Sequence, residues 1–336
     1  MKVTIREVAQ HAGVSLGTAS RVLNGHSNIN PKIVAKVQAS IKTLNYTPNL
    51  AAQSLKGDRT RTIGIVVHDI AAPAVSGYVT AAQDVLMDAG YALFVASTGR
   101  DLSRADAFLQ MLAARRVDGL IATIEPDAVA RYLQVKPQGR PAPLVLLDRN
   151  NPADADAAVI DHASGIDAAV RYLTGLGHTK IALLTGNRSL LPAGNRMDGF
   201  ERAMRAAGLP IRPNSIVTDS FEPKTAFKEA HALLAGPDRP TAILAGGINT
   251  LTGVLRATKM LGLSIPGDIS VIGSSDSDLA ELATPPITVV TWDSAEMGRA
   301  VAELVLKRIN HPEAEPQRLT FPSELLVRES CAAPRS

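Results

Sequence analysis

The sequence has little of what marks a secreted, membrane-bound or single-strand-binding protein. Its 336 residues include one cysteine, Cys331, so no internal disulfide can form. Aromatic residues make up 4% of the chain, too few for an extended platform on which single-stranded bases stack. It has no run of about 18 apolar residues, and its first residues show no apolar signal-peptide core. We therefore expect a cytoplasmic protein without membrane contact.

The spacing patterns of several common catalytic and metal sites are also absent. The zinc motif HExxH, the phosphate loop GxxxxGK[ST] and the dinucleotide motif GxGxxG do not occur. The histidines at positions 68, 162, 178 and 231 lack metal-ligand spacing. His178 follows a predicted helix end, where a cation suits the helix dipole, so we expect a structural or capping role for it. The glycine-rich AGGINTLTG (245–253) could hold a phosphate at a helix start, but it lacks the full fingerprint. We expect no catalytic residue, no metal and no cofactor.

Positive charge is concentrated at the start of the chain. Residues 1–61 contain nine Lys or Arg against two acidic residues, a net charge of +7. The whole chain carries +3, which leaves −4 for the residues that follow. A basic head on a mildly acidic body is typical of a nucleic-acid-binding module joined to another domain. A solvated basic face would have the same charge, so the pattern inside the head must separate these interpretations.

Three short helices are predicted in the first 46 residues. Thr4 and Glu7 have the spacing of a capping box, and apolar residues follow at helical spacing until Gly13 ends the segment. Ser15 can cap a second helix, and Asn30 a third. Three helices around one small core, two of them joined by a tight glycine-containing turn, indicate a helix-turn-helix domain.

Such a domain places its second helix in the major groove of DNA. Arg21 can form a bidentate contact with guanine, and Leu16 can touch a thymine methyl group. Thr18 and Ser20 can bond phosphate, although plain surface polarity would also explain them. Gly17 weakens a helix, so it is either silent toward the bases or permits close approach of the backbone.

These segments resemble the DNA-binding head of the LacI/GalR family of bacterial repressors. The resemblance lies in TIREVAQHAGVSLGTASRVLNG and in the later NY-P-N-AAQSL, without a gap from Val3 to Leu55. It implies a short hinge helix next, which Asn49 could cap and Gly57 could end. A helix this short is unstable alone, so it should order only against a twin and DNA.

By the same resemblance, Leu55 would be the wedge that enters the minor groove at the operator centre and unstacks a base step. The alternative is a linker residue that covers the core domain. The residues expected at the DNA are Thr4, Ser15, Leu16, Gly17, Thr18, Ser20, Arg21, Asn24, Asn49, Ala52, Gln53, Leu55 and Lys56.

From Thr62 onward, short β-branched runs alternate with amphipathic helical segments, the pattern of doubly wound parallel sheets. Two series of four or five strands fit two lobes better than one large sheet. The expected strands are 62–67, 91–96, 118–123, 143–147, 157–160, 180–185, 241–246, 269–273 and 287–291. The expected helices are about 77–89, 103–115, 127–135, 163–176, 196–207, 224–235, 249–261 and 294–309.

The resemblance extends over this body, which implies a two-lobed core like that of periplasmic binding proteins. The expected fold is therefore an all-α helix-turn-helix head joined to an α/β core with parallel sheets. We expect the head at 1–48, the hinge helix and linker at 49–61, and the effector-binding and dimerisation domain at 62–336. Lobe 1 would comprise about 62–161 and 293–320, and lobe 2 about 162–292 and 321–336.

Open α/β sheets bind ligands at the carboxyl ends of their strands, so two facing lobes would bind one between them. The resemblance implies that Arg196 in RMDGF binds the ligand, that Phe221 covers its ring, and that Asp148 lies in a strand-end loop. The residues expected at the effector are Asp69, Ala74, Val75, Asp148, Arg149, Arg196, Phe221, Asn249, Ser275 and Asp276.

Several positions depart from the family pattern. Ser275 replaces the usual aspartate that binds hydroxyls, and Gly247-Ile248 replaces an Asn-Asp pair, with Asn249 beyond it. Ala74-Val75 replaces an aromatic pair. Loss of carboxylates beside Arg196, with Arg149 and Arg188 close by, favours an anionic ligand because arginine grips carboxylate or phosphate bidentately. We expect a sugar acid or sugar phosphate, and neutral sugars remain the alternative if Asp276 replaces the missing carboxylate.

The sequence thus predicts a sequence-specific transcriptional regulator, a repressor of carbohydrate or sugar-acid genes under the control of a small ligand. It should bind operator DNA with an inverted repeat as a homodimer, because each head reads half a site. We expect the body to dimerise, with the helix at 77–89 as the first candidate surface. No heptad segment follows Arg328 to build a larger assembly. The alternative is a solute-binding or enzymatic α/β protein with an accessory nucleic-acid-binding head.

Overall fold

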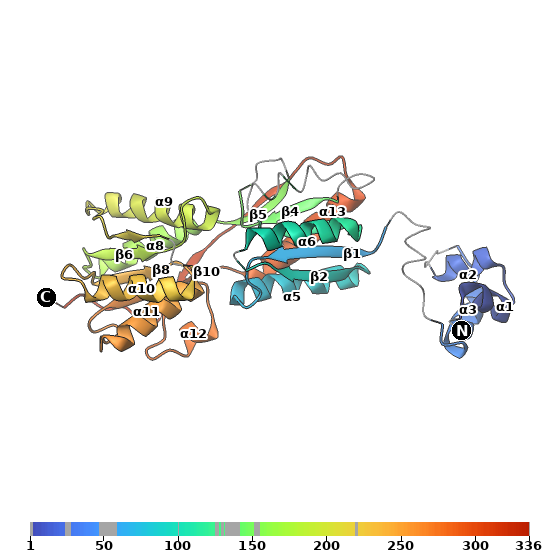
Figure 1. Cartoon of the computed structure of the whole chain (residues 1–336), viewed down its shortest axis with the longest axis horizontal. Helices are drawn as coiled ribbons and strands as arrows, with labels where there is room; N and C mark the ends of the chain where they lie inside the picture. Colours follow the sequence, from blue (N-terminus) through green and yellow to red (C-terminus); the bar gives the residue numbers. More distant parts are fainter. Residues whose placement is uncertain are drawn as a thin grey trace. The chain divides into compact units, whose positions relative to one another are not determined.

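The computed structural model describes residues 3–23, 28–46, 59–99, 101–124, 128, 131, 142–150, 155–218 and 221–335. The chain divides into two units, Met1–Thr60 and Arg61–Ser336 (Figure 1). We call the first unit the head and the second the body. In the described residues, no helix has both the length and the apolar character needed to span a bilayer.

The head contains the three predicted helices, α1 (Ile5–Ala12), α2 (Leu16–Leu23) and α3 (Pro31–Thr43). The capping box forms, because the Thr4 backbone N–H donates to Glu7 Oε2 at 2.6 Å. Gly13 ends α1 with φ = 66°, a left-handed conformation that favours glycine. The Ser15 hydroxyl accepts from the Thr18 N–H at 3.1 Å. Sequence-local capping chemistry therefore begins and ends α1 and begins α2.

One small apolar cluster holds the three helices together. Val8, Ala19 and Val37, one from each helix, are completely buried. Ala9 and Ala12 complete the buried set, and partly buried side chains surround it. The second helix thus buries its apolar face in the core, and its opposite face stays exposed.

Lobe 1 of the body is a six-stranded sheet in the order β11-β5-β4-β3-β1-β2, with parallel pairing throughout. Helices α5 and α13 cover one face and α6 covers the other (Figure 1). The strands are β1 (Thr62–Val67), β2 (Ala92–Ser97), β3 (Gly119–Ala122), β4 (Leu144–Leu147), β5 (Asp156–Ile160) and β11 (Arg318–Phe321). The helices are α5 (Pro73–Asp88), α6 (Leu102–Ala114) and α13 (Ser294–Asn310).

Lobe 2 is a second six-stranded sheet in the order β12-β10-β9-β8-β6-β7. Helices α8 and α9 pack on one face, and α10 and α11 pack on the other. The strands are β6 (Ile181–Leu184), β7 (Ile216–Val217), β8 (Ala242–Ala245), β9 (Ser270–Ser274), β10 (Thr288–Thr291) and β12 (Glu324–Leu326). The helices are α8 (His162–Gly175), α9 (Leu191–Ala206), α10 (Pro223–Ala235), α11 (Ile248–Met260) and α12 (Asp278–Glu281).

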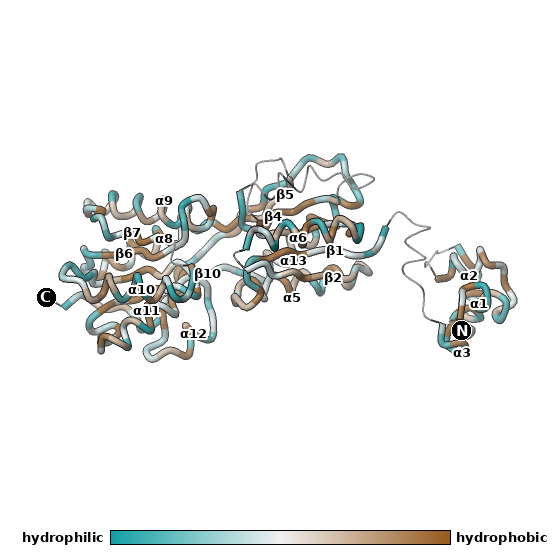
Figure 2. The backbone as a smooth tube through the Cα atoms, viewed as in Figure 1, coloured by the Kyte–Doolittle hydropathy of each residue, from teal (hydrophilic) through white to brown (hydrophobic). Residues whose placement is uncertain are grey.

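Apolar residues are concentrated on the central strands of both sheets (Figure 2). Because both faces of each sheet are covered, strands such as β4 and β8 are buried along their whole length. The predicted class of two mainly parallel α/β sheets is confirmed.

Three details differ from the sequence prediction. Strand β12 pairs antiparallel with β10, because the chain returns to lobe 2 along its edge. Helices α5 and α9 begin at Pro73 and Leu191 rather than at positions 77 and 196, since a proline fits the first turn of each helix. The short elements β7 and α12 were not predicted, as neither is long enough to show a period. The helix expected at about 127–135 lies largely outside the described residues.

Within residues 155–335, apart from 219–220, the chain passes between the two sheets three times. It does so between β5 and α8, between β10 and α13, and between β11 and β12. The first and third passages touch, because the Ser323 hydroxyl donates to the Asp161 carbonyl at 2.5 Å. These connections bring the carboxyl ends of strands from both lobes together.

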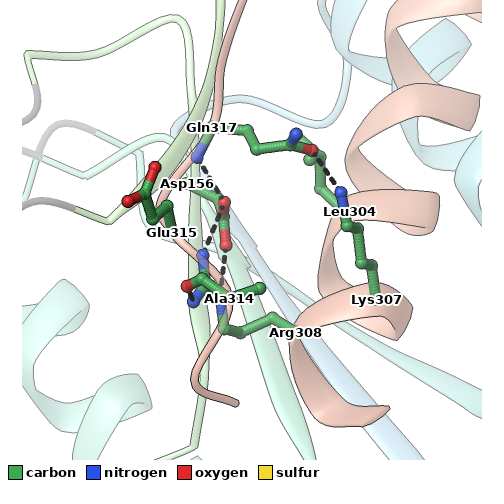
Figure 3. Close-up of a pocket in the computed structure, with 7 residues that line it drawn as sticks. All are labelled: Asp156, Leu304, Lys307, Arg308, Ala314, Glu315 and Gln317. Atoms are coloured by element: carbon green, nitrogen blue, oxygen red, sulfur yellow. Dashed lines mark hydrogen bonds and ion pairs between the residues drawn. The ribbon is translucent and has the colours of Figure 1, made fainter. Parts of the chain in front are cut away.

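The depression drawn in Figure 3 lies at the opposite, amino ends of β5 and β11. Arg308 of α13 pairs there with the buried Asp156 carboxylate, at 2.8 Å from Nε and 3.0 Å from Nη2. The Gln317 N–H donates to the same carboxylate at 2.8 Å. This ion pair fastens the end of α13 to the sheet edge, so we assign it a structural role.

His178 is buried and has the expected structural role, although its ring is neutral rather than a cation at the helix end. Its Nε2 lies 2.9 Å from the Ala332 carbonyl, which can only accept, so Nε2 carries the proton. Nδ1 lies 2.8 Å from the Thr241 hydroxyl. Burial lowers the pKa of His178, although its bond to Ala332 acts in the opposite direction. The neutral ring joins the C-terminal tail to lobe 2.

This burial predicts acid sensitivity. The unfolded chain takes up a proton near the ordinary histidine pKa, about 6.5, whereas folded His178 does so only at lower pH. The contribution of His178 to the free energy of unfolding should therefore be fully present above about pH 6.5. Below that pH it should fall, by up to about 1.4 kcal/mol per pH unit. Denaturant unfolding between pH 7 and 5 should show a shallower pH slope for His178→Gln than for the wild type. Equal slopes would contradict the assignment.

Candidate functional site

One face of α2 is free of the head core. Leu16, Gly17 and Arg21 are exposed, and Ser20 is half-buried beside them. Positions 16, 17, 20 and 21 share one side of a helix, whereas Ala19 on the opposite side is completely buried. Leu16 leaves 38% of its surface exposed, a notable exposure for leucine at the start of a helix. The structure therefore gathers the residues predicted to face base pairs on one surface.

Gly17 is not required by the packing of the head. A Cβ atom there would meet only the Ser15 hydroxyl, at 3.9 Å, so the fold has room for a side chain. Arg21 extends from the same face and donates to the Asn28 carbonyl at 3.5 Å. A missing side chain beside an extended arginine fits close approach of this face to another molecule.

Six of the residues expected at the DNA lie outside the described residues. They are Asn24, Asn49, Ala52, Gln53, Leu55 and Lys56. Thr4 is described, and its hydroxyl and N–H both pair with Glu7.

In the body, two strained residues follow strand ends. Asp148, just after β4 in lobe 1, has φ = 52°, and Ser275, just after β9 in lobe 2, has φ = 71°. Residues other than glycine rarely adopt this conformation, which is concentrated at functional sites. Asp148 is held by its N–H bond to the Ala158 carbonyl and by the Ile160 N–H, which donates to its carboxylate at 3.3 Å.

Asp148, His162 and Arg196 form a buried chain of hydrogen bonds between the lobes. The distance from Asp148 Oδ2 to His162 Nε2 is 3.0 Å. Arg196 Nη2 lies 3.2 Å from His162 Nδ1. Asp148 belongs to lobe 1, while His162 begins α8 and Arg196 lies on α9 in lobe 2. All three are buried.

The charges of this chain follow from its surroundings. Burial alone would raise the pKa of Asp148, but His162, Arg149 and Arg196 outweigh it and hold that pKa below its usual range. Burial and the positive charge of Arg196 lower the pKa of His162, against the opposite effect of Asp148 and Asp161. Burial lowers the pKa of Arg196 to about 10. At neutral pH the chain is carboxylate, neutral imidazole and guanidinium.

Two aromatic residues fix the imidazole of His162. The ring of Trp292 meets it edge to face, with centroids 5.2 Å apart. Trp292 Nε1 in turn donates to the Tyr78 hydroxyl at 2.8 Å. Burial and the charge of Asp148 raise the pKa of Tyr78 well above its ordinary value, so this phenol stays neutral.

Phe221 lies beside Arg196, whose guanidinium carbon is 6.0 Å from the ring centroid. The ring packs against Gly186 after β6 and Gly247 after β8, where a Cβ at Gly186 would overlap it. Asn249 Nδ2 donates to the Phe221 carbonyl at 3.1 Å. Phe221, Asn249 and Gly247 are therefore brought together at the carboxyl ends of two lobe 2 strands.

Some buried polar atoms of lobe 2 have no hydrogen-bond partner among the described residues. They are Arg196 Nε, Thr185 Oγ1 and Ser274 Oγ. Thr185 follows β6 and Ser274 ends β9, so both lie at carboxyl ends of strands. Buried polar groups are nearly always paired, so each of these atoms calls for a partner, a water molecule or a ligand, that the described residues do not supply.

Other residues predicted at the effector have different surroundings. Asp276 is bound by Arg328, whose Nη2 lies 2.8 and 3.0 Å from its two carboxylate oxygens. Asp69 accepts from the Ala71 N–H at 3.0 Å, and Val75 is buried in the lobe 1 core, with Ala74 against it. Arg188, expected near Arg196, pairs instead with Asp198 and Glu201 on α9.

Arg149 is buried and donates to the Asp148 carbonyl at 2.8 Å. Ser275 donates its hydroxyl to the Asp276 carbonyl at 3.4 Å. The arginine-rich character predicted for the site is therefore carried by Arg196 and Arg149.

Sequence reasoning missed His162, Tyr78 and Trp292. The only available signal was the Asp161-His162 pair where a strand gives way to a helix, and its partner Asp148 lies fourteen residues earlier. In the part of the chain that the structure describes, no group of acidic, histidine or cysteine side chains could hold a metal ion.

Two family descriptions match this chain. Residues 4–49 match bacterial regulatory proteins of the lacI family, and residues 170–331 match the periplasmic binding protein-like domain. The first match lies within the head and the second within the body.

Whole-length relatives are also found. The chain is 36% identical over 335 residues to the ribose operon repressor of Escherichia coli strain K12, covering 97% of this chain and 99% of that one. It is 34% identical over 333 residues to the transcriptional repressor PurR of Yersinia pestis strain Pestoides F, covering 98% and 97%. A crystal structure of the lac repressor dimer bound to operator and the anti-inducer ONPF matches with a TM-score of 0.86 and 28% identity, over 99% of this chain and all of that one.

Proposed function

The chain belongs to the lacI family of bacterial regulatory proteins, and we propose that it is a dimeric repressor controlled by a small anionic ligand. The observation that carries the ligand class is Arg196, a buried guanidinium whose Nε is unpaired among the described residues and which reaches the Asp148 carboxylate only through His162. The relatives that span both head and body are repressors rather than enzymes, which speaks against the enzymatic alternative.

For the DNA, we propose that α2 reads base pairs in the major groove through Leu16, Gly17 and Arg21. Thr18 and Ser20 would contact phosphate at the rim of that face. We place the head at 1–48, the hinge helix and linker at 49–61, and the effector-binding body at 62–336. By analogy with the family, Asn49 caps the hinge helix and Leu55 enters the minor groove.

Arg21→Ala should weaken operator binding by about 1–3 kcal/mol and relax specificity at one base pair per half-site. Arg59→Ala is the contrasting variant. If Arg59 contacts a phosphate, its loss should weaken binding to all DNA sequences alike and make the salt dependence of binding less steep. Fluorescence titration with the operator and with single-base variants of it separates the two patterns. An Arg21→Ala protein with unchanged base preference would refute this role for α2.

For the ligand, we propose a sugar acid or sugar phosphate. Asp148 reaches Arg196 only through His162, so an anion beside Arg196 would add a direct charge partner, and charge-assisted bidentate bonds are the strong ones. The unpaired hydroxyls of Thr185 and Ser274 suit the hydroxyl groups of a sugar. Asp276, which a neutral sugar would need as a replacement carboxylate, is already engaged by Arg328.

Calorimetry with aldonates, uronates, sugar phosphates and free sugars tests this class. We expect an acidic sugar to bind best. Tight binding of a neutral sugar that is indifferent to Arg196→Ala would overturn the proposal.

For the dimer, we propose that the body supplies the contact. The inward face of α5 packs on α13, so most of its apolar residues are already buried within the lobe. Met87 is the large apolar residue of α5 that remains exposed. Strand β2, however, is a sheet edge with Phe94 47% and Val95 44% exposed. Leu282, just after α12 in lobe 2, is 78% exposed. An apolar sheet edge left open invites association, so we place the dimer contact on β2, the end of α5 and α12.

A further inference from the structure

The hydrogen bonds of His162 can be assigned without ambiguity. A guanidinium has donors and no acceptor, so Nδ1 of His162 must accept from Arg196 Nη2. In the neutral ring, Nε2 then carries the hydrogen and donates to Asp148. A proton on Nδ1 would set two donors against each other and break the bond to Arg196.

This bond fixes the orientation of the guanidinium. Nη2 carries a second N–H, and the neighbouring Nε–H has no hydrogen-bond partner among the described residues. Two parallel N–H groups on one edge are the geometry that grips a carboxylate or a phosphate. The buried His162 ring, held by Trp292 and Asp148, therefore engages Nη2 of Arg196 and leaves its Nε–H without a partner among the described residues.

We propose that His162 is a positioning residue for the effector: as the neutral Nε2–H tautomer it orients Arg196 of lobe 2 and ties it to Asp148 of lobe 1. The inference rests on the proposed anionic effector and adds the residue that prepares the site for it. It also places the anion-binding arginine and the interlobe contact on one chain of hydrogen bonds.

Two isosteric variants separate the two bonds of His162. In His162→Asn, the amide oxygen can take the place of Nδ1 and accept from Arg196, but the bond to Asp148 is lost. In His162→Gln, the amide nitrogen can take the place of Nε2 and donate to Asp148, but the acceptor for Arg196 is lost. A merely structural histidine would make the two variants similar.

The probes are D-gluconate, D-glucuronate and D-ribose 5-phosphate, titrated by calorimetry into the full chain. For the tightest of the three, His162→Gln should bind at least tenfold more weakly than His162→Asn, because a hydrogen bond to a charged group accounts for roughly 10- to 100-fold in affinity. His231→Asn, on α10, is the matched control and should bind as the wild type does. Equal affinities for the Asn and Gln variants would overturn the positioning role.

Nitrogen-15 NMR of the histidine rings tests the same role without a ligand. Asp148, Asp161, Arg196 and Trp292 face this ring, and we expect one neutral tautomer with hydrogen on Nε2 at pH 7. Asp148→Asn should keep this tautomer, because Arg196 still donates to Nδ1. A protonated ring at pH 7, or a mixture of tautomers in the wild type, would refute the inference. If none of the three probes binds, the proposed effector class fails, and this spectrum still decides the role of His162.

Discussion

Leu282→Glu combined with Phe94→Glu is expected to convert the protein to monomers and to lower its operator affinity by two to four orders of magnitude. Both side chains are exposed apolar groups, and neither contributes to the buried cores of its lobe. Two joined heads bind the second half-site at high effective concentration, which raises affinity by about 10²–10⁴ without a new contact. Sedimentation velocity and operator titration measure the two consequences on the same samples.

Ile211→Glu is the matched control. Ile211 is also an exposed apolar residue of lobe 2, but it lies in the segment before β7, at the other edge of that sheet. It should leave both mass and operator affinity unchanged. If the double variant stays dimeric, the contact lies elsewhere on the body, and the surface of β2 and α12 is the wrong assignment.

Arg196→Ala is expected to abolish the response to the effector and to leave operator binding intact. Truncation of one partner in a buried, hydrogen-bonded charge pair costs about 2–5 kcal/mol, roughly a 30-fold to several-thousand-fold loss of affinity. Arg196→Lys keeps the positive charge but loses the two parallel N–H donors of the guanidinium. Its effector affinity should therefore lie between those of the wild type and Arg196→Ala. Calorimetry gives the affinity for the acidic sugar, and operator titration reports the integrity of the fold.

Arg205→Ala provides the control on the same helix. Arg205 is exposed and pairs with Glu201 one turn away, so its loss should change effector affinity less than twofold. An Arg196→Ala protein that binds the acidic sugar as the wild type does would remove this arginine from the site.

Much of the head could be predicted because its signals are local. The Thr4-Glu7 pair, the glycine at 13 and the Asn30-Pro31 start each act within one helical turn, and all three formed as expected. The strands of the body could also be found, since a fully buried strand requires a continuous apolar run. Their ends fell within about two residues of the predicted limits, as is usual for boundaries.

The site was harder to predict because its chemistry depends on contacts between distant residues. Arg196 was named from a family resemblance, but its partner His162 lies 34 residues earlier and belongs to another helix. Asp276 was considered as a replacement ligand, yet Arg328, 52 residues later, binds it. Position 178 shows the same limit: a structural or capping role was expected for a histidine after a helix end, but its burial beneath the C-terminal tail, which favours the neutral ring, could not be predicted.

The most direct test of this account is selection of random DNA duplexes by the purified full-length protein, followed by sequencing of the bound fraction. We expect an inverted repeat, with the two halves read by two heads and, by analogy with the family, a CG step at the centre. Enrichment should fall at one position in each half when Arg21→Ala is used. Recovery of sequences without a symmetric preference would contradict a dimeric, sequence-specific repressor.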